Sequence, residues 1–283
     1  MKEAGGWHAL IPGPITRPEE ALAFLNACGF CTWGPVPRLS FPNLAEAMGE
    51  TATSVLDRTW SWKDDLHFAK QLYYSKIIAG QPSFLAPDYL PDFISALAGR
   101  GLEHERDVTR LYIDGRLSGE AKTIYDWLLD HPVQPTRELR RGTRLGDTSK
   151  KLATERALVE LQRRFLICKV DLTGRTRGTY SYVWDLAERF WPQAFVAARH
   201  TSPVAARSKI HSQLGEFSLA SSPQLEKHLF AVLAVIWESC VLWPAMNNQC
   251  CTGYWYICSE KSPWKAREQA FIVCKKSCSS GNM

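Results

Sequence analysis

The sequence lacks the features that mark membrane-spanning, secreted and low-complexity chains. Its longest apolar run, Leu229–Trp243, has 15 residues and includes Glu238, whereas a spanning helix needs about 20 apolar residues. The first residues contain no sustained apolar stretch of the kind found in secretory signals. The remaining composition, 45% hydrophobic and 22% charged over 283 residues, is that of a soluble protein with a sizeable core. We therefore expect a cytoplasmic protein, associated with the nucleoid if the source is bacterial, with no membrane partner.

The cysteines form neither a disulfide framework nor a metal-binding pattern. Six of the nine lie in the last 44 residues. Cys28 and Cys31 form a C-x-x-C pair, but no second pair of cysteines or histidines at ligand spacing accompanies it. We interpret both as small buried thiols, the alternatives being half of a zinc site or a redox pair. We expect no metal and no other cofactor.

Composition and pattern divide the chain into five expected segments. They are a poorly ordered N-terminus (1–17), a helical N-terminal region (18–115), a winged helix (116–190), a helical extension (191–227) and an atypical tail (228–283). The tail is rich in Cys and Trp and follows no helical or strand period. One interpretation is a frameshifted or mis-spliced reading frame, and the other is a zinc-binding tail.

In the N-terminal region, apolar spacing predicts a helix that starts at Pro18 and is ended by Gly29. Three prolines make residues 30–42 a loop or extended chain. A short helix is predicted from Leu44, and a longer one over Pro87–Gly99.

Residues 116–190 show three helices followed by two strands. Ser118 is expected to cap the first helix and Thr136 the second, while a third helix leads to strands over Phe165–Leu172 and Thr179–Leu186. This order is that of a winged helix-turn-helix. The predicted fold class is therefore mainly α, of the α+β type, with a helical N-terminal region before the winged helix.

Basic residues concentrate in this segment: between residues 133 and 180, twelve Lys or Arg face five Asp or Glu. In a helix-turn-helix module the second helix of the pair enters the major groove while neighbouring elements contact phosphates. We therefore predict double-stranded DNA as the partner, the alternatives being a solvated basic face or a winged helix that binds protein. The candidate DNA-binding residues are Arg140, Arg141, Lys150, Lys151, Arg156, Arg163, Arg164, Arg175 and Arg177.

A set of short motifs spreads over residues 18–215. They are Gly29–Cys31, Trp60–Asp64, Leu72–Lys76, Gly80–Phe84, Gly115–Ser118, Thr136–Arg141, Ala157–Gln162 and Tyr182–Leu186. Together they resemble the bacterial AlkZ-related proteins of the AlkZ/YcaQ winged-helix group. The resemblance implies a relation to DNA glycosylases that excise bulky alkylated bases and unhook interstrand crosslinks without a metal.

The resemblance also shows a departure at the catalytic position. In those enzymes a Gln-x-Gln or Gln-x-Asp motif positions the water that attacks the sugar as the base leaves. The corresponding place here is Thr32-Trp33-Gly34, which has no carboxylate and no side-chain amide. The resemblance therefore implies a DNA-binding repair protein without the usual catalytic motif. The alternative is an active glycosylase in which Asp64 or Asp65 substitutes, close to Lys63.

Aromatic residues surround these candidate catalytic groups. Burial beside indoles and a cation can move the pKa of an aspartate, which is typical of catalytic carboxylates. The alternative is that Lys63 and Asp64 form a buried ion pair beneath the indoles. Trp62 and Tyr74 are candidates for stacking on an unpaired base, or else fill the core.

Overall fold

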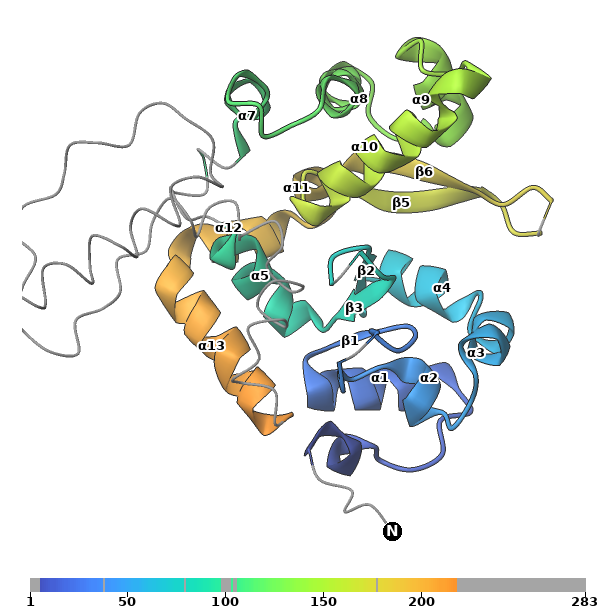
Figure 1. Ribbon diagram of the computed structural model, residues 1–283, viewed down its shortest axis with the longest axis vertical. Coiled ribbons are helices and arrows are strands. Elements are labelled where there is room, and N and C mark those ends of the chain that lie inside the picture. Colours follow the sequence, from blue (N-terminus) through green and yellow to red (C-terminus); the bar gives the residue numbers. More distant parts are fainter. Residues whose placement is uncertain are drawn as a thin grey trace, which may run out of the picture. The chain divides into compact units, whose positions relative to one another are not determined.

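The computed structural model describes residues 6–37, 39–78, 80–97, 103, 106–176 and 178–217. The predicted tail, the end of the helical extension and Arg177 lie outside these residues. The fold is mixed α+β, mostly helical, with two small antiparallel sheets (Figure 1). Among the helices of the described ranges, none combines the length and the apolar character that crossing a bilayer requires.

The first predicted helix is confirmed as α1 (Pro18–Cys28). Proline begins the helix because its missing N–H would have no partner in the first turn. The Glu20 carboxylate accepts hydrogen bonds from the backbone N–H groups of Thr16 and Arg17 at 2.7 and 3.1 Å. Gly29 ends the helix at φ 78°, a left-handed conformation that favours glycine.

Residues 6–17 pack on the core, whereas the sequence led us to expect a poorly ordered segment over residues 1–17. Gly6–Leu10 forms the 3-10 helix η1. Trp7 and Ile15 are 1% and 2% exposed, so this segment packs on the core of the N-terminal region. Two large apolar side chains are enough to anchor a segment whose Gly and Pro content suggested disorder.

The N-terminal region also contains a sheet, which the prediction of a helical region with a loop or extended chain at residues 30–42 did not include. Its strands are β1 (Phe30–Thr32), β2 (Tyr73–Ser75) and β3 (Ser83–Leu85), in the antiparallel order β1-β3-β2. Each strand has three residues and all nine are buried. No alternation of apolar and polar residues exists in such strands to reveal them in the sequence.

Short helices complete this region, and side chains cap three of them, Asp107 doing so at the start of α7 by accepting a hydrogen bond from the Arg110 backbone. Asn43 accepts a hydrogen bond from the Glu46 backbone at the start of α2, and Thr51 accepts one from Ser54 at the start of α3. The elements are α2 (Leu44–Ala47), α3 (Ala52–Arg58), α4 (Trp62–Phe68), η2 (Pro87–Tyr89), α5 (Leu90–Ala96) and α7 (Val108–Ile113).

The next region has three helices and a second sheet around its own apolar core. Its strands pair antiparallel in the order β4-β6-β5, and the short β4 was not predicted. The elements are α8 (Gly119–Asp130), β4 (Gln134–Pro135), α9 (Thr136–Gly142), η3 (Thr148–Lys150), α10 (Lys151–Arg163), β5 (Ile167–Gly174) and β6 (Ser181–Leu186).

One of the two predicted caps in this region is confirmed. Ser118 caps α8 by accepting a hydrogen bond from the Ala121 backbone. The prediction for Thr136 is wrong, because Thr136 is the first residue of α9 and Pro135 precedes it as the cap. The Thr136 hydroxyl instead donates to the Tyr182 carbonyl at 2.7 Å and accepts from the Trp184 indole at 2.9 Å. It ties α9 to β6 rather than starting the helix.

Three further helices return the chain to the N-terminal region: α11 (Ala187–Phe190), α12 (Pro192–His200) and α13 (Pro203–Glu216). Helices α12 and α13 pack against α5 (Figure 1). Phe195, Ile210 and Leu214 belong to the same core as α1 and β1–β3. This packing holds strand β5 against α4 and β2, where the charged residues meet.

Candidate functional site: a buried charged cluster and an exposed basic surface

Helix α4 places two of the candidate catalytic residues in the protein interior and the third at the surface. Lys63 and Asp64 are 2% and 1% exposed, whereas the next residue, Asp65, is exposed. On an α-helix each successive residue turns by about 100°, so adjacent carboxylates point in different directions. Only one of the two aspartates therefore takes part in the buried site.

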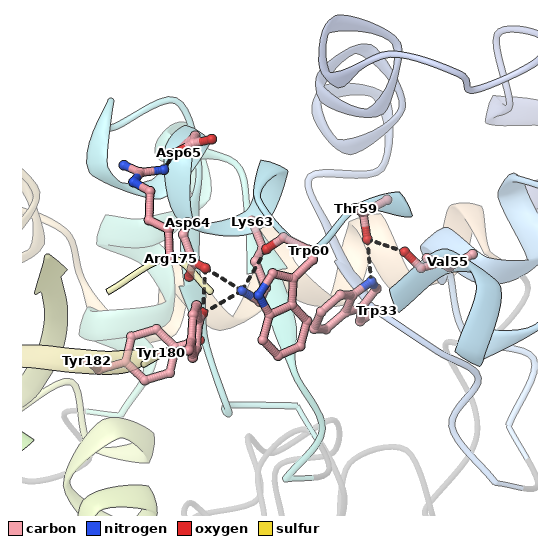
Figure 2. A network of polar contacts seen from close by, with 10 residues as sticks. All are labelled: Trp33, Val55, Thr59, Trp60, Lys63, Asp64, Asp65, Arg175, Tyr180 and Tyr182. Carbon is pink, nitrogen blue, oxygen red and sulfur yellow. Dashed lines mark hydrogen bonds and ion pairs between the residues drawn. The ribbon is translucent and has the colours of Figure 1, made fainter. Parts of the chain in front are cut away.

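The predicted buried ion pair between Lys63 and Asp64 is confirmed (Figure 2). The Lys63 ammonium also donates to the Trp60 carbonyl at 2.8 Å and to the Tyr180 hydroxyl at 2.6 Å. Tyr180 in turn donates to Asp64 Oδ2 at 2.5 Å. The Tyr182 hydroxyl lies 2.6 Å from that of Tyr180. We call this group, together with Lys169 described below, the buried cluster.

Asp64 has one oxygen that no other group satisfies. Oδ2 holds Lys63 and Tyr180, but Oδ1 is buried and has no hydrogen-bond partner within the described part of the chain. A buried carboxylate oxygen without a donor costs free energy, which makes it an acceptor that a ligand or water can satisfy.

Aromatic rings enclose the Lys63 ammonium. Its Nζ lies 4.4 Å from the ring centroid of Trp60, 4.9 Å from that of Tyr180, and 5.7 Å from those of Trp33 and Tyr74. Burial lowers the pKa of Lys63, and the hydrogen bond and charge of Asp64 oppose this shift. Ring faces and the carboxylate together stabilise the ammonium where water is excluded.

A second buried lysine, which the sequence analysis did not treat as a site residue, completes the buried cluster. Lys169 on β5 is 3% exposed, and its Nζ lies 3.6 Å from the Tyr74 ring centroid and 4.5 Å from that of Tyr182. Burial lowers the pKa of Lys169 well below its usual value; the charge of Asp64 opposes this shift, and the charges of Lys63 and Lys76 add to it. The signal in the sequence was a single lysine inside an apolar strand.

His67 joins three elements beneath the buried cluster. Its Nδ1 accepts from the Tyr74 backbone N–H at 3.2 Å, so its Nε2–H donates to the Lys169 carbonyl at 2.8 Å. Complete burial lowers its pKa to about 4. A neutral imidazole therefore links α4, β2 and β5 at neutral pH.

The segment Thr32-Trp33-Gly34 lies beside the buried cluster, and its polar atoms are already used. The Trp33 indole donates to the Thr59 hydroxyl at 2.9 Å, which donates to the Val55 carbonyl at 2.6 Å (Figure 2). Thr32 donates to the Gly34 carbonyl at 2.8 Å. The position that carries the catalytic motif in the resembling enzymes thus supplies an aromatic wall here.

Asp65 and Arg175 form a separate, exposed contact. Arg175, in the turn between β5 and β6, donates to Asp65 Oδ1 at 2.6 Å (Figure 2). The Arg175 side chain is 65% exposed and the Asp65 side chain is 49% exposed. This contact fastens the turn to α4 beside Tyr180.

The two residues predicted to stack on a base are not free on the surface. Tyr74 is 4% exposed and lies against Lys169. Trp62 is half-buried and packs against the core of the N-terminal region. Stacking of either ring on a base requires the buried cluster to open.

Of the nine predicted DNA-binding residues, the eight that the structure describes separate into exposed and protein-bound groups. Five are exposed: Arg141, Lys150, Lys151, Arg156 and Arg175. Arg137 and Arg144, which were not among the candidates, are also exposed. We use the name basic surface for the exposed Lys and Arg residues of α9, η3, α10 and the turn at Arg144. They are Arg137, Arg141, Arg144, Lys150, Lys151 and Arg156.

Three candidates contact protein instead. Arg140 is 27% exposed and its Nη2 lies 3.7 Å from Glu155. Arg164 donates to the Arg116 carbonyl at 2.6 Å. The Arg163 guanidinium lies so close to Gly80 that a Cβ there would be 2.3 Å from Nη2. These three are left out of the basic surface.

The cysteines within the described ranges are isolated thiols. Cys28, Cys31 and Cys168 are free and buried, and burial raises the pKa of Cys28 to about 12. In those same ranges no three His, Cys, Asp or Glu side chains are placed to hold a metal ion. The C-x-x-C pair therefore packs as apolar groups at the end of α1.

Comparison with known proteins agrees with the motifs of the sequence. No curated protein and no solved structure shows significant similarity to the chain. A model of the family described as AlkZ related matches residues 15–231, which is more than half of the chain. The chain belongs to the AlkZ-related family.

Proposed function

We propose that the chain is a double-stranded-DNA-binding protein, related to the AlkZ-type DNA glycosylases, that holds DNA with a winged helix over residues 116–190. Helices α9 and α10 with the turn between them form the helix-turn-helix, and β5–β6 forms the wing. Residues 18–115 and 191–227 form the helical scaffold around it. Family membership and the shared core of α8, α10 and β6 support this assignment.

The exposed basic surface carries the proposal. Lys150, Lys151 and Arg156 are exposed, and none of them forms an ion pair within the ranges that the structure describes. Cations that are not paired with protein carboxylates can bind phosphates and so release the counterions condensed on DNA. Helix α9 and the β5–β6 turn lie on the same side of the view in Figure 1.

The test is a salt titration of duplex binding, followed by fluorescence anisotropy. Replacing Lys150, Lys151 and Arg156 with Ala should lower affinity for every sequence and reduce the slope of log K against log salt by about 2.7, since each phosphate contact contributes about 0.9. The control replaces Arg58 on α3 and Arg110 on α7, exposed arginines that are paired with Glu50 and Asp114, and should leave the slope unchanged. Affinity indifferent to salt would favour a protein-binding winged helix.

A second candidate function, base excision, rests on the unpartnered Oδ1 of Asp64. The oxygen belongs to the buried cluster, whose Lys63 ammonium lies 5.7 Å from the ring centroid of Trp33, in the segment that corresponds to the catalytic motif of the resembling enzymes. A carboxylate there can hold a water and stabilise the positive charge that develops on the sugar. Asp65 is less suited because it is exposed and paired with Arg175.

Excision is tested by counting abasic sites after incubation with alkylated or crosslinked duplex. Asp64→Asn should abolish release, and the neighbouring Asp65→Asn is the matched control that should retain it. If the wild-type protein releases no more base than a heat-killed sample, the chain binds DNA without excising bases.

A further inference from the structure

The buried cluster holds more positive than negative groups. Lys63, Lys169 and Asp64 are 2%, 3% and 1% exposed, so two amines share one carboxylate away from water. An ion removed from water costs several kcal/mol unless a partner compensates it. Asp64 compensates one ammonium, which leaves the other without a counterion.

The contacts show which amine is left over. Lys63 donates hydrogen bonds to Trp60, Asp64 and Tyr180, which uses all three of its N–H groups. Lys169 Nζ forms no ion pair and no hydrogen bond with any residue that the structure describes, and it faces two tyrosine rings. The two ring faces stabilise an ammonium, but burial disfavours the charged form and lowers the pKa of Lys169 well below its usual value. In its uncharged form, Lys169 has a free nitrogen lone pair.

We propose that Lys169 is an uncharged amine nucleophile that forms an imine with the aldehyde of an abasic deoxyribose. The Nζ lone pair forms a bond to the aldehyde carbon, and the carbonyl oxygen takes up the proton that the nitrogen loses. The carbinolamine then loses water to give the C=N bond, so no oxidant or reductant is needed. The inference rests on the proposed DNA binding, because DNA supplies the aldehyde.

The β5–β6 hairpin gives the aldehyde a way in. It carries Lys169 near its base, paired with Trp184, and Tyr180 near its tip, just before β6. Among the residues that the structure describes, the exposed Arg175–Asp65 contact and the Tyr180 hydroxyl hold the tip on α4, and the His67 bond to the Lys169 carbonyl holds the base, so opening has to release all three. A DNA phosphate competes with Asp65 for Arg175, which connects binding of the duplex to opening of the buried cluster.

The experiment traps the imine in the full chain. The protein is incubated with a duplex that contains one abasic site, sodium borohydride reduces C=N to a stable secondary amine, and the adduct is separated on a denaturing gel. Peptide mapping of the wild-type adduct should place it on Lys169. Lys169→Met should lower the adduct yield at least tenfold, whereas Lys122→Met, which removes a lysine on α8, should not.

Binding of each variant to the same duplex is measured without borohydride. Wild-type binding without an adduct would overturn the proposal and leave DNA binding standing. An adduct that maps to Lys150, Lys151 or Lys63 would also overturn it, a result that does not depend on how Lys169→Met folds. Absence of wild-type binding would contradict the proposed function itself.

Discussion

Lys63, Asp64 and Lys169 are at most 3% exposed, whereas Lys150, Lys151 and Arg156 lie in solvent. In the buried cluster each charge depends on a particular neighbour, since water is absent. On the basic surface water and counterions stabilise each charge, and no protein partner is needed. The same residue types thus depend on protein neighbours in one region and on solvent in the other.

Asp64 and Asp65 show the difference at adjacent positions. Asp64 is enclosed by Lys63 and Tyr180, and Asp65 reaches Arg175 across the surface. Substitutions in the buried cluster should therefore change stability, and those at the surface should change DNA affinity with little effect on folding. The following predictions test this division.

The largest expected effect is that of Lys63→Met. It leaves Asp64 buried without its cation, so the free energy of unfolding should fall by about 3–5 kcal/mol, measured by urea denaturation. The double variant Lys63→Met with Asp64→Leu should recover part of the loss, because it leaves no buried charge. Lys122→Met, at an exposed pair with Asp126, is the control. A loss of less than about 1 kcal/mol for Lys63→Met would show that the buried cluster is hydrated.

Acidification should destabilise the fold through His67. Its pKa is about 4 in the folded state, because of burial, against about 6.5 when unfolded. Between these values the unfolded chain binds a proton that the folded chain does not, so stability falls as the pH decreases. The loss should approach about 3 kcal/mol near pH 4. Urea denaturation at several pH values measures it.

The control for this pH effect is His67→Gln, which cannot take up the proton. Carboxylates also titrate in this range, so the difference between the two proteins isolates the contribution of His67. Equal pH slopes for His67→Gln and wild type would contradict the neutral buried imidazole.

Tyr180→Phe should have an intermediate effect. It removes the hydroxyl that contacts Lys63 and Asp64 but keeps the ring against Trp60. Unfolding free energy should fall by about 1–2 kcal/mol, measured by urea denaturation. Tyr112→Phe, at a 47% exposed ring, should change nothing and serves as the control.

The smallest effect on stability is expected for Arg175→Ala. The contact with Asp65 is exposed, so the urea midpoint should not move measurably, and Asp65→Asn should behave in the same way. Duplex affinity should fall across all sequences, with a salt slope lower by about 0.9, because a phosphate contact carries no base code. A clear loss of stability with unchanged duplex affinity would contradict the assignment of Arg175 to DNA binding rather than to folding stability.

Many of the helices could be predicted from the sequence because the apolar residues that face the core recur at helical spacing. Helices α1, α8 and α10 carry apolar residues at helical spacing, and Ser118 and Gly29 mark ends. The strands β1, β2 and β3 have three residues each, too few for a period, so only their pairing defines them. Thr136 looked like a cap because a hydroxyl before a helix usually is one, but β6 offered it other partners.

The sequence by itself determined the basic segment at residues 133–180 and the charged, Trp-rich segment at residues 60–65. It also determined the order of three helices and a hairpin, and the resemblance to the AlkZ-related family. Which of those charges are buried was decided by the tertiary structure. Lys63 and Tyr180 are 117 positions apart and meet where strand β5 lies against α4 and β2. The burial of Lys169 depends on the same packing, and that burial, rather than its place in a basic segment, sets its chemistry.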